Sequence, residues 1–185
     1  MRNVYSVILA LLSIGSVALA NNLENNLKEA AIEAKILLNK VHIQFFLEIA
    51  EAVESNKIAP EEDIEKWHGY ASELRSWNVT TEEDYLIPLR RIVSHIPVPQ
   101  LSSRINTYLN GGYSRFESDM LKRSDQQYTS FKIRASDIIN DAKKAGYTNE
   151  ILNNKFNDFR SSKNHYQQEY NFNILLSYLN GLKLN

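Results

Sequence analysis

The chain of 185 residues contains no cysteine. It therefore cannot form disulfides, use a thiol nucleophile, or hold zinc or an iron–sulfur cluster through sulfur ligands. It also lacks an excess of basic residues, because 21 Lys and Arg are set against 22 Asp and Glu. This balance disfavours nucleic acid, whose phosphates bind concentrated positive charge. With 6 glycines, 4 prolines and 43% hydrophobic residues, the composition excludes a disordered or collagen-like chain.

An apolar run opens the chain and has the pattern of a secretory signal. A short, positively charged start precedes it, and it ends in Ala-Leu-Ala at residues 18–20, with small residues where signal peptidase accepts them. The run is slightly shorter than the roughly 20 residues that a membrane span needs. We therefore expect a cleaved signal peptide over residues 1–20, with residues 21–185 secreted and no stable transmembrane anchor. In a Gram-negative bacterium the destination would be the periplasm.

The rest of the chain has the rhythm of amphipathic helices. Apolar residues recur every three or four positions, and no stretch shows the sustained alternation of β-branched residues that marks a strand. We expect four helical segments, at residues 22–56, 60–96, 100–146 and 148–181. Short connections make neighbouring helices antiparallel. The sequence thus predicts an all-α, elongated, coiled-coil-like bundle with up-down-up-down order, forming one domain over residues 21–185.

Several residues are expected to interrupt or end these segments. The second helix is expected to break near Asn78 and to kink at Pro88, because proline removes a backbone donor inside a helix. Gly111-Gly112 either bends the third helix or ends it, and the sequence leaves both alternatives open. Gly146 suits the left-handed position that follows many helices, and Thr148 is then expected to cap the last helix.

The apolar stripes also identify the expected core. In the first segment the stripe passes through Leu27, Leu37 and Ile49, and in the third it passes through Phe131. Alanine at either Leu37 or Phe131 is expected to destabilise the fold by about 2–5 kcal/mol.

Sequence patterns that support catalysis are missing. Glu65 and His68 form one Glu-x-x-His unit, whereas di-iron bundles need two such units and two further glutamates. The Gly-x-Ser-x-Gly, phosphate-loop and dinucleotide patterns do not occur. The acidic triplets at 61–63 and 82–84 are expected in first helical turns, where they offset the helix dipole. We expect a non-enzymatic protein without a metal or cofactor.

Tyrosine and phenylalanine give the strongest indication of a binding surface. They concentrate in the second half of the chain, and the candidate interaction surface consists of Tyr166, Tyr170, Phe172 and Tyr178. Such residues at helical spacing usually belong to a core, but tyrosine is also frequent at contact surfaces. The chain's one Asn-x-Ser/Thr tripeptide makes Asn78 a candidate for N-glycosylation in a eukaryotic source.

Two classes of function are best supported, and an enzyme with an unfamiliar site is the least favoured class. The first is a secreted protein that binds an extracellular protein partner through a helix face. The alternative is an extracellular carrier of lipid or another small apolar ligand, or a membrane-active bundle. The helices lack the Lys- and Arg-rich polar faces that are typical of interfacial binders, which favours the first class.

Overall fold

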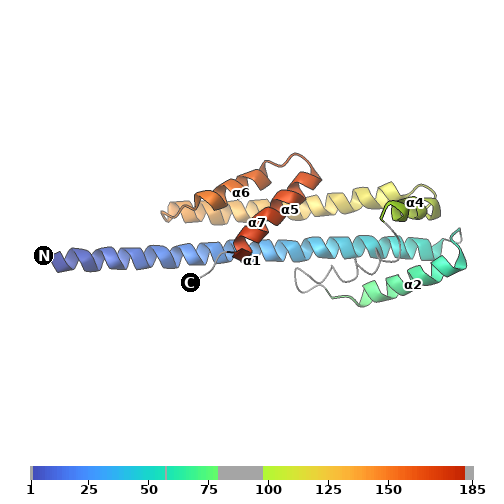
Figure 1. Ribbon diagram of the computed structural model, residues 1–185, viewed down its shortest axis with the longest axis horizontal. Helices are drawn as coiled ribbons and strands as arrows, with labels where there is room; N and C mark the ends of the chain where they lie inside the picture. The colour runs from blue at the N-terminus through green and yellow to red at the C-terminus, as the bar shows by residue number, and fades with distance from the viewer. Residues whose placement is uncertain (1, 57, 79–97, 182–185) are drawn as a thin grey trace. The chain divides into compact units, whose positions relative to one another are not determined.

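The computed structural model describes residues 2–56, 58–78 and 98–181. Within these residues the chain is all-α and contains no strand, which confirms the predicted fold class. None of the described helices is long and apolar enough to cross a membrane. The helices are α1 (Arg2–Ser55), α2 (Glu61–Ser76), α4 (Val98–Tyr108), α5 (Tyr113–Lys144), α6 (Glu150–Arg160) and α7 (His165–Gly181) (Figure 1).

The chain divides into two compact units. Unit 1 consists of Met1–Ile32 and Tyr128–Asn185, and unit 2 consists of Glu33–Gln127. The long helices α1 and α5 each contribute residues to both units. The up-down-up-down order and the single domain remain predictions.

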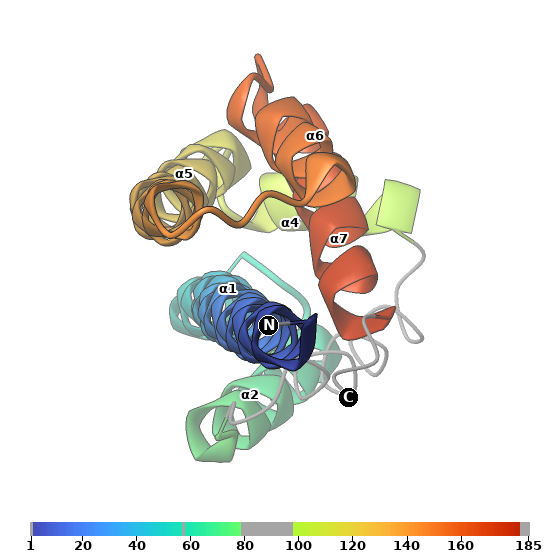
Figure 2. The ribbon, with the colours of Figure 1, turned by 90° about the vertical axis from the view of Figure 1, so that its left-hand side faces the viewer.

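Unit 1 is built around a helical hairpin and an aromatic core. The helices α6 and α7 lie side by side in both ribbon views (Figure 1 and Figure 2). Their rings meet those of α5, because Phe172 lies 5.2 Å from Phe131 and 5.6 Å from Phe159, measured between ring centroids. The ring of Tyr128 lies 5.8 Å from Phe159. All four residues are buried, so the contacts of these rings fix how α7 is rotated in unit 1.

The break between α6 and α7 was not predicted, so the single helix expected over residues 148–181 is wrong. At the break, the amide N–H of Gln167 donates to Oδ1 of Asn164 over 2.9 Å. The side chain of Gln167 in turn accepts from the N–H of Lys163 over 3.0 Å. This arrangement resembles a capping box and starts a new helix without glycine or proline.

The end of α5 confirms the prediction for Gly146. This glycine has a φ of +82°, and its N–H donates to the carbonyl of Lys143 over 3.0 Å. The N–H of Tyr147 donates to the carbonyl of Ala142 over 2.9 Å, which completes a Schellman motif. The next helix is capped by Asn149, not by Thr148 as predicted, because Oδ1 of Asn149 accepts from the N–H of Leu152 over 3.0 Å.

A second Schellman motif settles the alternative at Gly111-Gly112. The helix α4 ends at Tyr108, and Asn110 follows with a left-handed φ of +52°. The N–H of Asn110 donates to the carbonyl of Thr107 over 3.2 Å, and that of Gly111 donates to Asn106 over 2.8 Å. The glycines therefore end a helix, and the segment predicted over residues 100–146 is two helices.

Unit 2 packs the second half of α1 against α2 and α4. Its core includes Ile49 and Val53 from α1, Trp67 and Ala71 from α2, and Ile105 from α4, all at most 2% exposed. The end of α2 at Ser76 agrees with the break predicted near Asn78. Pro88 and the kink predicted there lie outside the described residues, as does the triplet at 82–84.

The core of α1 differs from the predicted stripe at Leu37. That side chain is 39% exposed, whereas the neighbouring Leu38 is 2% exposed. Steps of three and of four residues both satisfy a helical stripe, and the buried path runs from Ala34 to Leu38. Phe131 is 3% exposed and lies in the core as predicted.

These two positions give a matched test of the core. Phe131→Ala is expected to lower the free energy of unfolding by about 3–5 kcal/mol, because it leaves a cavity beside the rings of Phe159 and Phe172. Leu37→Ala is expected to lower it by less than about 1 kcal/mol. Urea denaturation of both variants, followed by circular dichroism, measures the difference. Equal losses would contradict the assignment of the core face.

Candidate functional site

The structure divides the predicted interaction surface into an exposed part and a buried part. Tyr166 and Tyr170 are 73% and 67% exposed and lie one turn apart on α7. Phe172 is fully buried in the core of unit 1, so its predicted place on a surface is wrong. Tyr178 is half-buried, and its hydroxyl oxygen accepts from Nδ2 of Asn149 over 3.2 Å. The two exposed tyrosines, named here the tyrosine face, remain as the candidate.

The amphipathic pattern of α7 explains this division. Its buried residues lie on one side of the helix, each three or four positions from two of the others: Phe172, Leu175, Leu176 and Leu179. A step of 100° per residue places Tyr166 and Tyr170 on the opposite side of the helix. Packing against α5 and α6 thus turns the tyrosine face outward.

The rest of α7 carries little charge. Glu169 is its one Asp, Glu, Lys or Arg residue, and asparagine, glutamine and serine supply most other polar groups. The helix is held against α5 by Lys132, whose Nζ lies 2.8 Å from Oε1 of Gln168 and 5.0 Å from the ring centroid of Phe159. Tyrosine surrounded by small polar and amide side chains is the composition of many protein-binding surfaces.

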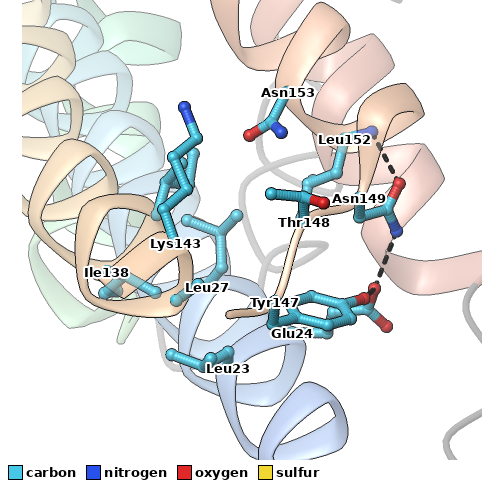
Figure 3. A pocket seen from close by; sticks show the side chains of 12 residues that line it. Leu23, Glu24, Leu27, Ile138, Lys143, Tyr147, Thr148, Asn149, Leu152 and Asn153 are labelled. Atoms are coloured by element: carbon cyan, nitrogen blue, oxygen red, sulfur yellow. Dashed lines mark hydrogen bonds between the residues drawn. The ribbon is translucent and has the colours of Figure 1, made fainter. Parts of the chain in front are cut away.

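A small cavity lies elsewhere in unit 1, between α1 and the connection from α5 to α6. Its volume is about 20 Å³. Six of its lining residues are apolar: Leu23, Leu27, Ile138, Ile139, Ala142 and Leu152. Figure 3 shows that Glu24, Tyr147 and Asn149 gather at one side of it. A cavity of this volume has room for about one water molecule.

Those three polar residues form a hydrogen-bonded cluster. The hydroxyl of Tyr147 donates to Oε1 of Glu24 over 2.5 Å, and Nδ2 of Asn149 donates to the same oxygen over 2.8 Å (Figure 3). Through Asn149 the cluster extends to Tyr178 on α7. Burial, together with the hydrogen bond to Glu24, raises the pKa of Tyr147 to about 12. The cluster joins three distant parts of unit 1, so it serves the fold.

The sequence gives no local signal for this cluster. Glu24 and Tyr147 are 123 residues apart, and no spacing rule for one helix links them. The capping role of Asn149 was the one detectable feature, because asparagine before a helix is a common N-cap.

Two ion pairs in unit 2 join α1 to other helices. Nδ1 of His68 lies 2.7 Å from Oε1 of Glu54, so this partner of His68 is on α1 and is not Glu65 of the Glu-x-x-His unit. Arg123 binds Glu48 through two nitrogens over 2.9 and 2.7 Å, and this bond lowers the pKa of Glu48. Among the described residues, no group of three or more His, Asp or Glu is arranged to hold a metal ion.

The other sites named from the sequence have simple surroundings. The acidic triplet at 61–63 occupies the first turn of α2, as predicted. Asn78 is exposed in non-helical backbone directly after that helix, while the rest of its tripeptide lies outside the described residues. A groove of about 440 Å³ beside Trp67 and Tyr70 is lined by charged side chains, those of Asp63, Glu65, Lys66, Glu73 and Arg104.

The pKa of Tyr147 can be measured directly. Subtracting the alkaline absorbance titration of Tyr147→Phe from that of the unmodified chain isolates this phenol, and we expect a midpoint near pH 12. Glu24→Gln removes the carboxylate charge and is expected to lower the midpoint. Because folding raises the pKa of Tyr147, this phenol stabilises the folded chain. Its contribution to the free energy of unfolding is complete below the ordinary phenol pKa and is lost as pH rises through about 12. A midpoint at the ordinary phenol pKa would contradict the burial of Tyr147 and its hydrogen bond to Glu24.

Comparison of the chain with protein-family models, with curated proteins and with solved structures finds no match. Its function is therefore inferred from its own residues.

Proposed function

We propose that this chain is a secreted, non-enzymatic helical protein that binds an extracellular protein partner through the tyrosine face of α7. One observation carries the proposal. Tyr166 and Tyr170 are 73% and 67% exposed on one side of a helix whose other side is fully packed. The helix thus holds two large aromatic side chains at its surface, and neither of them packs in the core.

Tyrosine at such a position is suited to binding. Its ring supplies a large contact area at a low cost in side-chain entropy, and its hydroxyl hydrogen-bonds at the edge of a contact. Tyrosine is enriched among the few interface residues whose removal costs about 2 kcal/mol or more of binding free energy. The scarcity of charge on α7 favours a partner surface that is recognised by contact and hydrogen bonding, with little electrostatic attraction.

The small cavity supports this proposal over a carrier of lipid. Sites that hold small molecules enclose about 300–1,000 Å³. The apolar cavity of unit 1 encloses about 20 Å³. Two grooves of unit 2, of about 440 and 600 Å³, are lined mostly by charged groups, which do not suit a lipid chain. Neither the cavity of unit 1 nor these two grooves is matched to an apolar ligand.

Secretion is proposed from the N-terminal pattern alone. The tripeptide at residues 18–20 is the expected cleavage site, and the protein that binds would begin at Asn21. In a eukaryotic source, Asn78 is the proposed acceptor of a glycan, and its exposure after α2 supports that role.

The experiment compares the chain with a variant that lacks both exposed rings. The protein is expressed with its own leader, collected from the medium, immobilised, and incubated with detergent-solubilised surface proteins of the source organism. Tyr166→Ser combined with Tyr170→Ser is expected to weaken capture of a specific partner by about tenfold or more, which affinity titration of that partner measures. Serine has a helix propensity close to that of tyrosine, so α7 should be retained.

Ile151→Ser is the matched control. Ile151 is 58% exposed on α6 in the same unit, so its replacement also removes an exposed apolar side chain. This variant should capture the partner as well as the unmodified chain does. Equal capture by the double tyrosine variant, or absence of the protein from the medium, would contradict the proposal.

A further inference from the structure

The turn after α4 brings together two features that make an asparagine chemically reactive. Asn110 is exposed and lies outside any helix, with a left-handed φ of +52°. The next residue, Gly111, is also exposed and has a φ of +81°. A glycine after asparagine leaves its backbone nitrogen unhindered by a side chain, which is the condition for attack on the asparagine amide.

We propose that Asn110 is a site of spontaneous deamidation. The backbone nitrogen of Gly111 attacks Cγ of Asn110, a new C–N bond closes a succinimide ring, and the bond from Cγ to the side-chain nitrogen breaks. The proton lost by the attacking nitrogen leaves with that group as ammonia. Water then opens the ring at either carbonyl, giving aspartate or isoaspartate. Water is the only co-reactant, and the modification is independent of the proposed partner binding.

The folded turn controls this reaction. The N–H of Gly111 donates to the carbonyl of Asn106 over 2.8 Å, in the Schellman motif that ends α4. The nitrogen that must attack is therefore engaged, and the last turn of α4 has to open before the ring can close. Asn106, Thr107, Asn110 and Gly111 are all exposed, so this opening is a local event at a helix end.

Two contacts to Tyr108, the last residue of α4, resist the opening. Nδ2 of Asn56 donates to the carbonyl of Tyr108, and the hydroxyl of Tyr108 donates to Oδ2 of Asp63. Asn56 lies in the connection after α1, and Asp63 lies in the first turn of α2. The rate of deamidation at Asn110 thus reports how firmly α4 is anchored in unit 2.

The product loosens the same turn. Isoaspartate inserts one additional carbon into the backbone, so the Schellman hydrogen bonds can no longer form with the same geometry. Either product also places a carboxylate at the C-terminal end of α4, where the helix dipole disfavours negative charge. Deamidation would therefore release the end of α4 irreversibly.

The experiment follows the peptide that contains Asn110 by mass spectrometry during incubation of the full chain at neutral and mildly alkaline pH. In the native chain this peptide is expected to acquire the mass of the deamidated form, more slowly than in urea and faster as pH rises. Tyr108→Phe removes the hydroxyl bond to Asp63 and is expected to accelerate the reaction by about threefold to tenfold. Circular dichroism verifies that this variant is folded.

Tyr147→Phe is the matched control, because it removes a hydroxyl bond to a carboxylate in unit 1. Deamidation at Asn110 should proceed at the same rate in this variant as in the unmodified chain. A native chain whose Asn110 stays intact while the chain in urea is converted would overturn the proposed site. If the rate in folded Tyr108→Phe is unchanged, or if both variants accelerate the reaction equally, the contacts of Tyr108 do not limit deamidation at Asn110 and that part of the proposal is wrong.

Discussion

The aromatic core of unit 1 is the constraint on which the candidate site depends. Phe131 on α5, Phe159 on α6 and Phe172 on α7 meet within 5.7 Å between ring centroids, so the three helices share one set of contacts. Burying Phe172 fixes the rotation of α7. Once that rotation is fixed, Tyr166 and Tyr170 must face outward, because they lie on the other side of the helix.

Much of the helical fold follows from the sequence, because apolar periodicity is a local property. The C-terminal ends of α1 and α5 were predicted, through the end of the first segment at residue 56 and through Gly146. The break between α6 and α7 was missed, because α6 ends at Arg160 and Asn164 and Gln167 start α7 without glycine or proline. A capping box inside an apolar stripe is a weak signal, and the stripe concealed it.

The candidate site was predictable only in part. Aromatic density directed the prediction to α7, but spacing alone did not separate Tyr166 and Tyr170 from Phe172, since which side of a helix is buried depends on its neighbours. The same limit explains Leu37, which satisfies the stripe of α1 although Leu38 occupies the core. The cluster of Glu24 with Tyr147 depends on tertiary contacts across 123 residues, so no local pattern encodes it.

Nitration with tetranitromethane tests the central claim most directly, because the reagent modifies tyrosine rings in proportion to their exposure. Among the tyrosines whose exposure the structure describes, peptide mapping of the folded full chain after brief treatment should find Tyr166 and Tyr170 modified first. Tyr128, which is 2% exposed within the aromatic core, should remain unmodified until the chain is unfolded. Early nitration of Tyr128, or protection of both residues of the tyrosine face in the isolated protein, would contradict the account.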